Sequence, residues 1–177
     1  VMKMFSALKA EKNLSRLFSE RDCRTAAATK ALSNLTNLGQ SAVPIIIRSL
    51  SSTDKKQTIA LVNVLTDLVD DRSFPLFAEA LKNSNRECAS GAGWALSNST
   101  NYNADRLLAL IGQDDISMAL MSDILRAQVG RLDIRKLINR AYELDHQNQI
   151  AVFKLVKEFV GIEILPELIA RIDGGNP

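Results

Sequence analysis

The chain has 177 residues, of which 46% are apolar but only 5% aromatic, with 8 Gly and 4 Pro. This composition is typical of a helical protein whose core is built from Ala, Leu and Ile. Lys and Arg number 22 against 20 Asp and Glu. So small a surplus argues against a nucleic-acid partner, because proteins of that class neutralise phosphates with many cations.

Cysteine usage and hydropathy bear on location. Cys23 and Cys88 follow neither a metal-ligand spacing nor a secreted disulfide pattern, which favours a reduced, cytoplasmic location. The sequence contains no window of about 18 apolar residues, so it predicts no membrane partner. The chain begins with Val1 ahead of the first Met and ends on "DGGNP" directly after a helical pattern. These ends would fit a piece excised from a longer protein.

The first 12 residues are expected to form an N-terminal cap, because "MKMFSALKAEKNLSRLFSE" is irregular around "AEKN" and predicts a capping turn followed by a short helix. Beyond it, an apolar pattern returns about every 30 residues. "AVPIIIRSL", "SFPLFAEAL" and "EILPELIARI" place Pro44, Pro75 and Pro166 before apolar runs. Proline tolerates the first turn of a helix, so each is predicted to begin one. Residues 104–111 and 133–141 keep the pattern without proline.

A second helix is predicted after each first one, over residues 23–35, 55–68, 86–98, 116–129 and 148–160. Polar turns precede these runs and supply N-cap candidates: Asp22, Thr53 or Asp54, Ser84 or Asn85, Asp114 or Asp115, and Asp145. Two-helix units of this length cannot bury their apolar faces alone, so they stack into a solenoid. The sequence therefore predicts one all-α domain over 1–177, a right-handed α–α superhelix of about five repeats. The repeats are 13–40, 41–71, 72–102, 103–131 and 132–161, followed by a partial repeat over 162–177.

The repeats resemble the short bacterial HEAT-like repeats, in which "AVPxLIxxL" precedes a helix like "VRxxAAxALxxL". The likeness is carried by "SAVPIIIRSL", "SFPLFAEALKNSNRECASGAGWALSN" and "TAAATKALSNL", and it covers nearly the whole chain. It implies the solenoid fold and second helices that line a concave surface. Because the family includes scaffolds, adaptors, chromophore-lyase subunits and DNA glycosylases, the resemblance leaves the function open.

A ladder of polar side chains is predicted along the second helices. When these helices are aligned on one apolar position (Ala31, Val64, Ala95, Ile124 and Leu155), the preceding residue is polar in every repeat except at Trp94. Residues three or four further on share that helical face. The candidate partner-binding residues are Lys30, Asn34, Asn63, Asp67, Trp94, Asn98, Asp123, Arg126, Lys154 and Glu158.

The stretch "GWALSN" also resembles the third helix of armadillo repeats, where a Trp and an Asn four residues later bind extended peptides. Trp94 and Asn98 match both positions, whereas "KALSN" keeps Asn34 but has Lys30 in place of Trp. The repeats are about ten residues shorter than armadillo repeats. Only the groove chemistry is therefore implied: Trp supplies rigid apolar area, and Asn both donates to and accepts from a peptide backbone.

Two interpretations of Trp94 stay open on the sequence. It is either an exposed binding anchor or a core or partly buried residue, since one position of helix rotation separates them. Gly91 and Gly93 cost stability inside a helix, and they would fit either close helix packing or room for the indole.

The sequence contains few residues of the types that carry catalysis. His146 is expected in a solvated turn, and the Asp114 and Asp115 pair fits an N-cap better than a metal site. We therefore predict no enzyme, no metal and no cofactor, but a protein-interaction scaffold that binds a protein or an extended peptide. The alternatives are a HEAT-like DNA glycosylase or other nucleic-acid-binding module, using Trp94, Asp123 and Arg126, and a chromophore-lyase subunit. The position where that glycosylase family has a carboxylate is Asn98 here.

Overall fold

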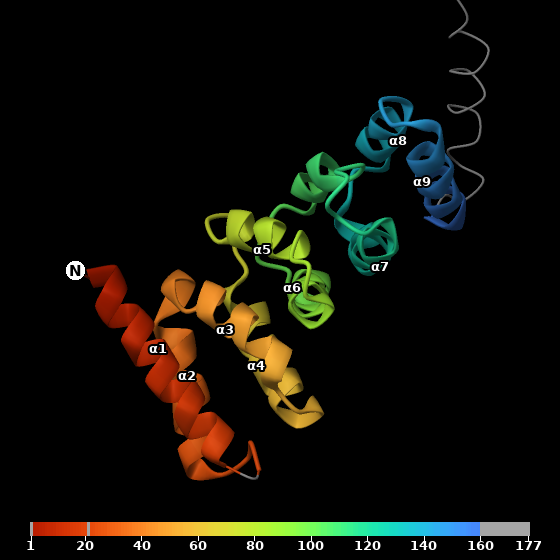
Figure 1. Ribbon diagram of the computed structural model, residues 1–177. Helices are drawn as coiled ribbons and strands as arrows, with labels where there is room; N and C mark the ends of the chain where they lie inside the picture. The colour runs from red at the N-terminus through yellow and green to blue at the C-terminus, as the bar shows by residue number, and fades with distance from the viewer. Residues whose placement is uncertain (1, 21, 160–177) are drawn as a thin grey trace, which may run out of the picture.

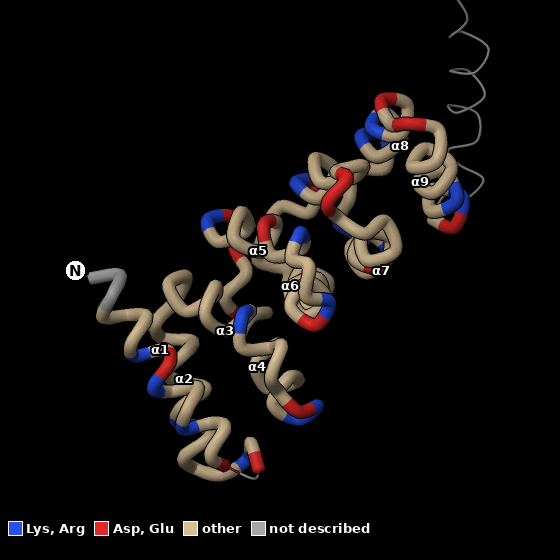
Figure 2. The backbone as a smooth tube through the Cα atoms, in the orientation of Figure 1, with Lys and Arg blue, Asp and Glu red and all other residues tan. Residues whose placement is uncertain are grey.

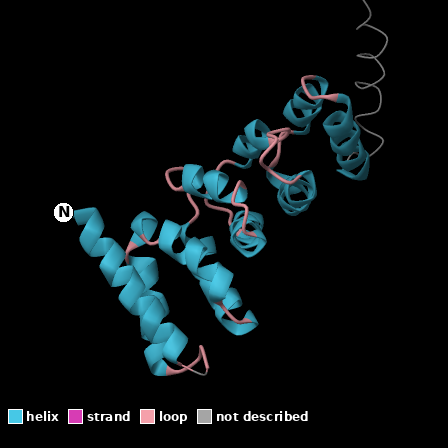
Figure 3. Ribbon diagram, viewed as in Figure 1, coloured by secondary structure: helices cyan, strands magenta, loops and turns pink. Residues whose placement is uncertain are grey.

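A computed structural model of the chain describes residues 2–20 and 22–159, with side chains from residue 5 onward. In this part of the chain the regular secondary structure is entirely helical, with loops between the helices and no strand (Figure 3). The α-helices are α1 Met2–Ser19, α2 Ala26–Asn37, α3 Val43–Ser49, α4 Lys55–Leu68, α5 Phe74–Leu81, α6 Arg86–Asn98, α7 Met118–Gln128, α8 Ile134–Tyr142 and α9 His146–Phe159. The 3-10 helices are η1 Gly39–Ser41, η2 Leu50–Ser52, η3 Ala104–Leu110 and η4 Val129–Arg131. The predicted all-α class is confirmed; the predicted partial repeat over 162–177 lies outside the described residues.

The helices form successive pairs. α2, α4, α6, α7 and α9, here called the second helices, pack in sequence, α4 on α2, α6 on α4, α7 on α6 and α9 on α7. In Figure 1 the labels α4, α6, α7 and α9 follow one side of the array, and α3, α5 and α8 follow the other. One contiguous apolar core runs from Ala10 to Val156 between the two sides. Residues that recur in each second helix therefore recur along one side of the molecule, which we call the second-helix face.

Polar side chains fix where several second helices begin. Asp54 forms a capping box with Gln57, in which each side chain accepts from the other's backbone N–H, and Asn85 accepts from the amide of Cys88. Such caps satisfy donors that have no partner inside the helix. The predicted caps Asp54 and Asn85 are confirmed. Asp145 also accepts backbone amides at the start of α9, at 3.0 and 3.1 Å.

Two other predicted caps are wrong. Thr25, rather than Asp22, caps α2 by accepting from Ala28, because Asp22 instead accepts the amide of Arg24 in the preceding turn. Ser117, rather than Asp114 or Asp115, caps α7. The buried Ile116 intervenes between the two aspartates and the helix, so the helix begins after it.

The N-terminal region differs from the expected capping turn and short helix. α1 runs unbroken from Met2 to Ser19, through "AEKN" and across the expected boundary at residue 12. Asn13 is only 8% exposed; its amide donates to the Lys9 carbonyl, and its Oδ1 accepts from Asn34. A buried side chain with both bonds made is compatible with a continuous helix. The first helix expected over 104–111 also differs, because it is the 3-10 helix η3.

Adjacent pairs are joined by buried hydrogen bonds. Gln128, 2% exposed, donates to the carbonyls of Leu96, Ser97 and Ser99 at 2.8, 2.8 and 3.1 Å. Arg131 donates to the carbonyls of Ser99 and Thr100. The Leu96 and Ser97 carbonyls belong to the last turn of α6, where a helix has acceptors without an internal partner, and Ser99 and Thr100 directly follow the helix. Side chains at the end of α7 and in η4 therefore donate to the free carbonyls at the end of α6.

Aspartates make a second connection, on the first-helix side. Asp71 accepts the backbone amide of Asn103 at 3.0 Å, and one unit later Asp105 accepts the amide of Asp133 at 2.9 Å. The ammonium of Lys136 donates to the other Asp105 oxygen at 2.6 Å. Burial opposes ionisation of Asp105, but these two hydrogen bonds outweigh it and lower its pKa. The segment before α5 is thus bonded to the start of η3, and η3 is bonded to the start of α8.

Candidate functional site

The candidate site lies on the second-helix face. The residues used to align the repeats, Ala31, Val64, Ala95, Ile124 and Leu155, are all 5% exposed or less. The residue just before each of these positions, and the residue one turn after that, therefore point away from the core. Nine of the ten predicted binding residues are exposed: Lys30, Asn63, Asp67, Trp94, Asn98, Asp123, Arg126, Lys154 and Glu158.

Trp94 is exposed rather than part of the core, with 48% of its surface accessible. Asn98, one turn further along α6, donates its amide to the Trp94 carbonyl at 2.8 Å, which leaves its Oδ1 oxygen for a partner. The two side chains of the predicted Trp–Asn pair thus lie on the same exposed surface. Of the two interpretations left open by the sequence, the exposed one agrees with the structure.

The glycines beside Trp94 serve close helix packing. A Cβ at Gly91 would overlap the Leu50 side chain and meet Val62, both on the N-terminal side of α6. A Cβ at Gly93 would lie 2.7 Å from Leu120 on α7. Together the two glycines let α6 approach its neighbours on both sides, which is where a missing side chain is useful.

Asn34 behaves differently from the prediction. It is half-buried, and its amide donates to Asn13 of α1 at 3.0 Å. Its amide group is therefore engaged by its own chain, so it does not offer the free donor that the armadillo resemblance implies. By contrast, the side chains of Lys30, Asn63, Asp67 and Lys154 make no hydrogen bond or ion pair with any described residue.

Exposed apolar side chains on the same face were missed by the sequence analysis. Ile59 of α4 is 39% exposed and Ile150 of α9 is 43% exposed. Each lies five residues before the aligned core position of its helix, Val64 and Leu155. The alignment extended from the residue just before the core position to those one turn after it, and Ile59 and Ile150 lie one turn earlier. With Trp94, these side chains give the face apolar area in three of its five second helices.

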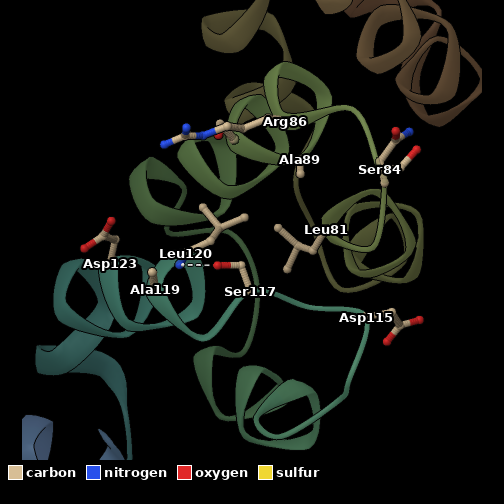
Figure 4. A pocket seen from close by; sticks show the side chains of 11 residues that line it. Leu81, Ser84, Arg86, Ala89, Asp115, Ser117, Ala119, Leu120 and Asp123 are labelled. Atoms are coloured by element: carbon tan, nitrogen blue, oxygen red, sulfur yellow. Dashed lines mark hydrogen bonds between the residues drawn. The ribbon is translucent and has the colours of Figure 1, made fainter.

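A cavity of about 320 Å³ lies between the starts of α6 and α7 (Figure 4). Leu81 and Leu120 point toward one another at its centre, while Arg86, Asp123 and Asp115 lie around them (Figure 4). Its remaining lining residues are Asn83, Ser84, Ala89, Ser90, Ser117 and Ala119. An apolar floor with charged groups of both signs at the rim suits one amphipathic side chain of a ligand. Only Asp123 of this set was predicted from the sequence.

Asp123, Arg126 and Glu158 form an ion-pair network between α7 and α9. Arg126 donates to both Glu158 oxygens at 2.9 and 3.3 Å and to Asp123 at 3.2 Å. The hydrogen bonds from Arg126 lower the pKa of Glu158. Because the guanidinium is shared by two carboxylates, its charge is already balanced. Arg126 is therefore not an uncompensated cation that could bind a phosphate.

Few groups suited to metal binding or catalysis are found in the part of the chain that the structure describes. No group of three or more His, Cys, Asp or Glu side chains could hold a metal ion among residues 5–20 and 22–159. His146 is exposed at the first position of α9 rather than in a turn. Cys88 is buried, and this burial raises the pKa of its thiol. No described helix combines the length and hydropathy needed to cross a membrane.

Comparison with known proteins adds no relative: no family model matches the chain, and neither the curated proteins nor the solved structures gave a match.

Proposed function

We propose that this chain is a non-catalytic protein-interaction scaffold, a right-handed solenoid of about five HEAT-like repeats whose second helices line a concave groove. The ligand in this proposal is a protein segment or extended peptide, and the groove is the second-helix face. The exposed Trp94, 48% accessible at a position that is polar in the other four repeats, carries the proposal. Free Cys23 and Cys88 fit a cytoplasmic location.

The chemistry of the face suits a peptide. Tryptophan is among the residues most enriched at binding hot spots, where it supplies rigid apolar area. Asn63 of α4 can both donate to and accept from a peptide backbone, and the Oδ1 of Asn98 on α6 can accept from it. The cavity between α6 and α7 begins one turn before Trp94, at Ser90. A ligand that covers the indole can thus place an adjacent side chain in this cavity.

The proposal is tested by selecting binders from a random library of 12-residue peptides displayed on phage. For peptides that bind the wild-type chain, Trp94→Ala should weaken binding by about 2 kcal/mol, or roughly 30-fold. The matched control is Leu76→Ala on α5, since Leu76 is exposed to 36% and belongs to a first helix. Equal melting temperatures of both variants and the wild type show that the fold is retained.

Two results would contradict this function. One is an unchanged affinity in Trp94→Ala, or an equal loss in Leu76→Ala. The other is release of bases from alkylated duplex DNA that Asp123→Asn abolishes, which would establish the glycosylase alternative.

A further inference from the structure

Basic side chains cluster on one surface of α1. Lys9, Lys12 and Arg16 are all exposed, and their spacing of three and four residues places them on one helical face. Figure 2 shows blue, basic positions spaced along α1 with red beside them. The acidic residue in the sequence of α1 is Glu11, which lies about 100° or more around the helix from each of the three cations. The three positive charges thus face the same way without a carboxylate between them.

The cluster lines a cavity of about 340 Å³ between α1 and α2. Its lining residues are Lys9, Lys12, Asn13, Arg16, Asn34, Asn37 and Leu38. Every polar side chain in this set is a cation or an amide, so the cavity offers many hydrogen-bond donors and no acidic group. Donors and positive charge converging on one hollow are the chemistry that binds a carboxylate or phosphate.

The cations of the cluster have no partner among the described residues. Lys9, Lys12 and Arg16 make no side-chain hydrogen bond or ion pair within residues 5–20 and 22–159. In the C-terminal half, Arg106, Arg126 and Lys136 each pair with a carboxylate. Like charges one turn apart destabilise a helix, and a bound anion would remove this repulsion.

The amides of α2 connect the cluster with the second-helix face. Asn34 is held by its hydrogen bond to the buried Asn13, which fixes α2 against α1 at the base of the cavity. Asn37 is exposed and makes no described hydrogen bond. Lys30 lies one turn before Asn34 on α2, outside the lining of the cavity, and makes no hydrogen bond or ion pair with a described residue. Because Asn34 lines the cavity and belongs to the first of the second helices, the cavity adjoins the N-terminal end of the second-helix face.

We propose that this cavity, the α1–α2 basic site, binds an acidic segment of the peptide ligand. The inference rests on the proposed function and specifies the ligand's charge: carboxylates over α1 and α2, and apolar side chains toward Trp94. The site is short, since Lys9 and Arg16 are separated by about 10 Å along the helix axis. Exposed carboxylates follow along the second helices at Asp67, Glu87 and Asp123. They would repel the phosphates of a long nucleic acid, so a peptide fits better.

The probe is a fluorescein-labelled octaglutamate peptide, titrated with the full chain at low salt and followed by fluorescence anisotropy. The charge reversal Lys12→Glu with Arg16→Glu should weaken its binding by at least about tenfold. The control is Lys55→Glu with Lys56→Glu, two exposed lysines at the start of α4 that make no described ion pair and give the same change in net charge. It should leave affinity within about twofold. If the reversed variant melts early, Lys12→Gln with Arg16→Gln replaces it and should weaken binding in the same direction.

Three outcomes would overturn the inference: no binding of octaglutamate, equal losses in the two charge-reversed variants, or tighter binding of a labelled 12-base-pair duplex than of octaglutamate. The Trp94→Ala variant separates this inference from the proposed function, because it should bind octaglutamate as well as the wild type. If selected peptides depend on Trp94 but octaglutamate does not bind, only the basic site is refuted. If octaglutamate binds through α1 but no selected peptide depends on Trp94, only the Trp94 groove is refuted.

Discussion

An indole left half in water, as Trp94 is on α6, has apolar surface that a ligand can still cover. Each square ångström of apolar area removed from water contributes about 25 cal/mol, and an aromatic residue supplies more of this area than any other side chain. Ala95 and Leu96 on the core side of the same helix are fully buried, so α6 needs no contribution from the indole to stay packed. Trp94 can therefore be replaced with little loss of folding stability.

Trp94→Ala should consequently leave the free energy of unfolding within about 0.5 kcal/mol of the wild type, as for other surface substitutions. Thermal melting checks this directly. As the chain has one Trp, its fluorescence is a second measurement: emission should be red-shifted and readily quenched by iodide. A loss of about 3–5 kcal/mol, typical of a truncated core Trp, or blue-shifted, protected emission would contradict the exposed position.

Individual residues also show where sequence reasoning ends. An exposed Trp94 was one of two interpretations left open by the sequence, favoured by four equivalent residues, such as Lys30 and Asn63, that are polar. Asn34 passed the same test, yet its amide is bound to Asn13, 21 residues away. The periodicity of α2 describes which way Asn34 points but contains no information about a partner on another helix. The α1–α2 basic site was missed for the same reason.

At the scale of elements, local chemistry decided what could be predicted. The boundaries of α4 and α6 agree with the prediction, residues 55–68 and 86–98, because each has a side-chain cap before an amphipathic run. η3 occupies the predicted place of a first helix but in 3-10 geometry; its four buried residues, Ala104, Leu107, Leu108 and Leu110, keep the apolar spacing that predicted it. Periodicity indicates which face is buried more reliably than it indicates the type of helix.

The contact between η3 and α8 gives a pH-dependent prediction. The pKa of Asp105 is lowered in the folded chain, so the carboxylate stabilises the fold above the ordinary aspartate pKa and this contribution is lost as the pH falls through the folded value. Asp105→Asn removes the pair with Lys136, whose side chain is 59% exposed. We therefore expect only about 1 kcal/mol of destabilisation at neutral pH, or about 2–4 °C in melting temperature.

This difference between Asp105→Asn and the wild type should close as the pH falls below the ordinary aspartate pKa of about 4 and through the lower pKa of the folded chain. Melting curves across this range, with Asp114→Asn as control, provide the measurement. Asp114 is exposed and makes no hydrogen bond or ion pair with the described residues. A difference that persists at low pH, or an equal effect of the control, would show that the Asp105 carboxylate does not link η3 to α8.

At the scale of the whole molecule, the helix pairs follow one another along the chain (Figure 1), and the sequence pattern recurs with a period of about 30 residues. Hydrogen bonds between pairs recur at similar separations, 32 residues from Asp71 to Asn103 and 28 from Asp105 to Asp133. Each unit is tied mainly to its neighbours, as in repeat proteins. Exposed side chains of the second helices thereby come to lie along one side, although they are distant in sequence.

In the proposed function, this side of the molecule binds the ligand. The most direct measurement is a nitrogen-15 correlation spectrum of the chain, recorded with and without a selected 12-residue peptide. We expect the Trp94 indole N–H and the side-chain amides of Asn63 and Asn98 to shift, while the backbone amides of Leu76 and Glu79 on α5 stay in place. Shifts confined to α3 and α5, with an unchanged Trp94 indole signal, would contradict the claim.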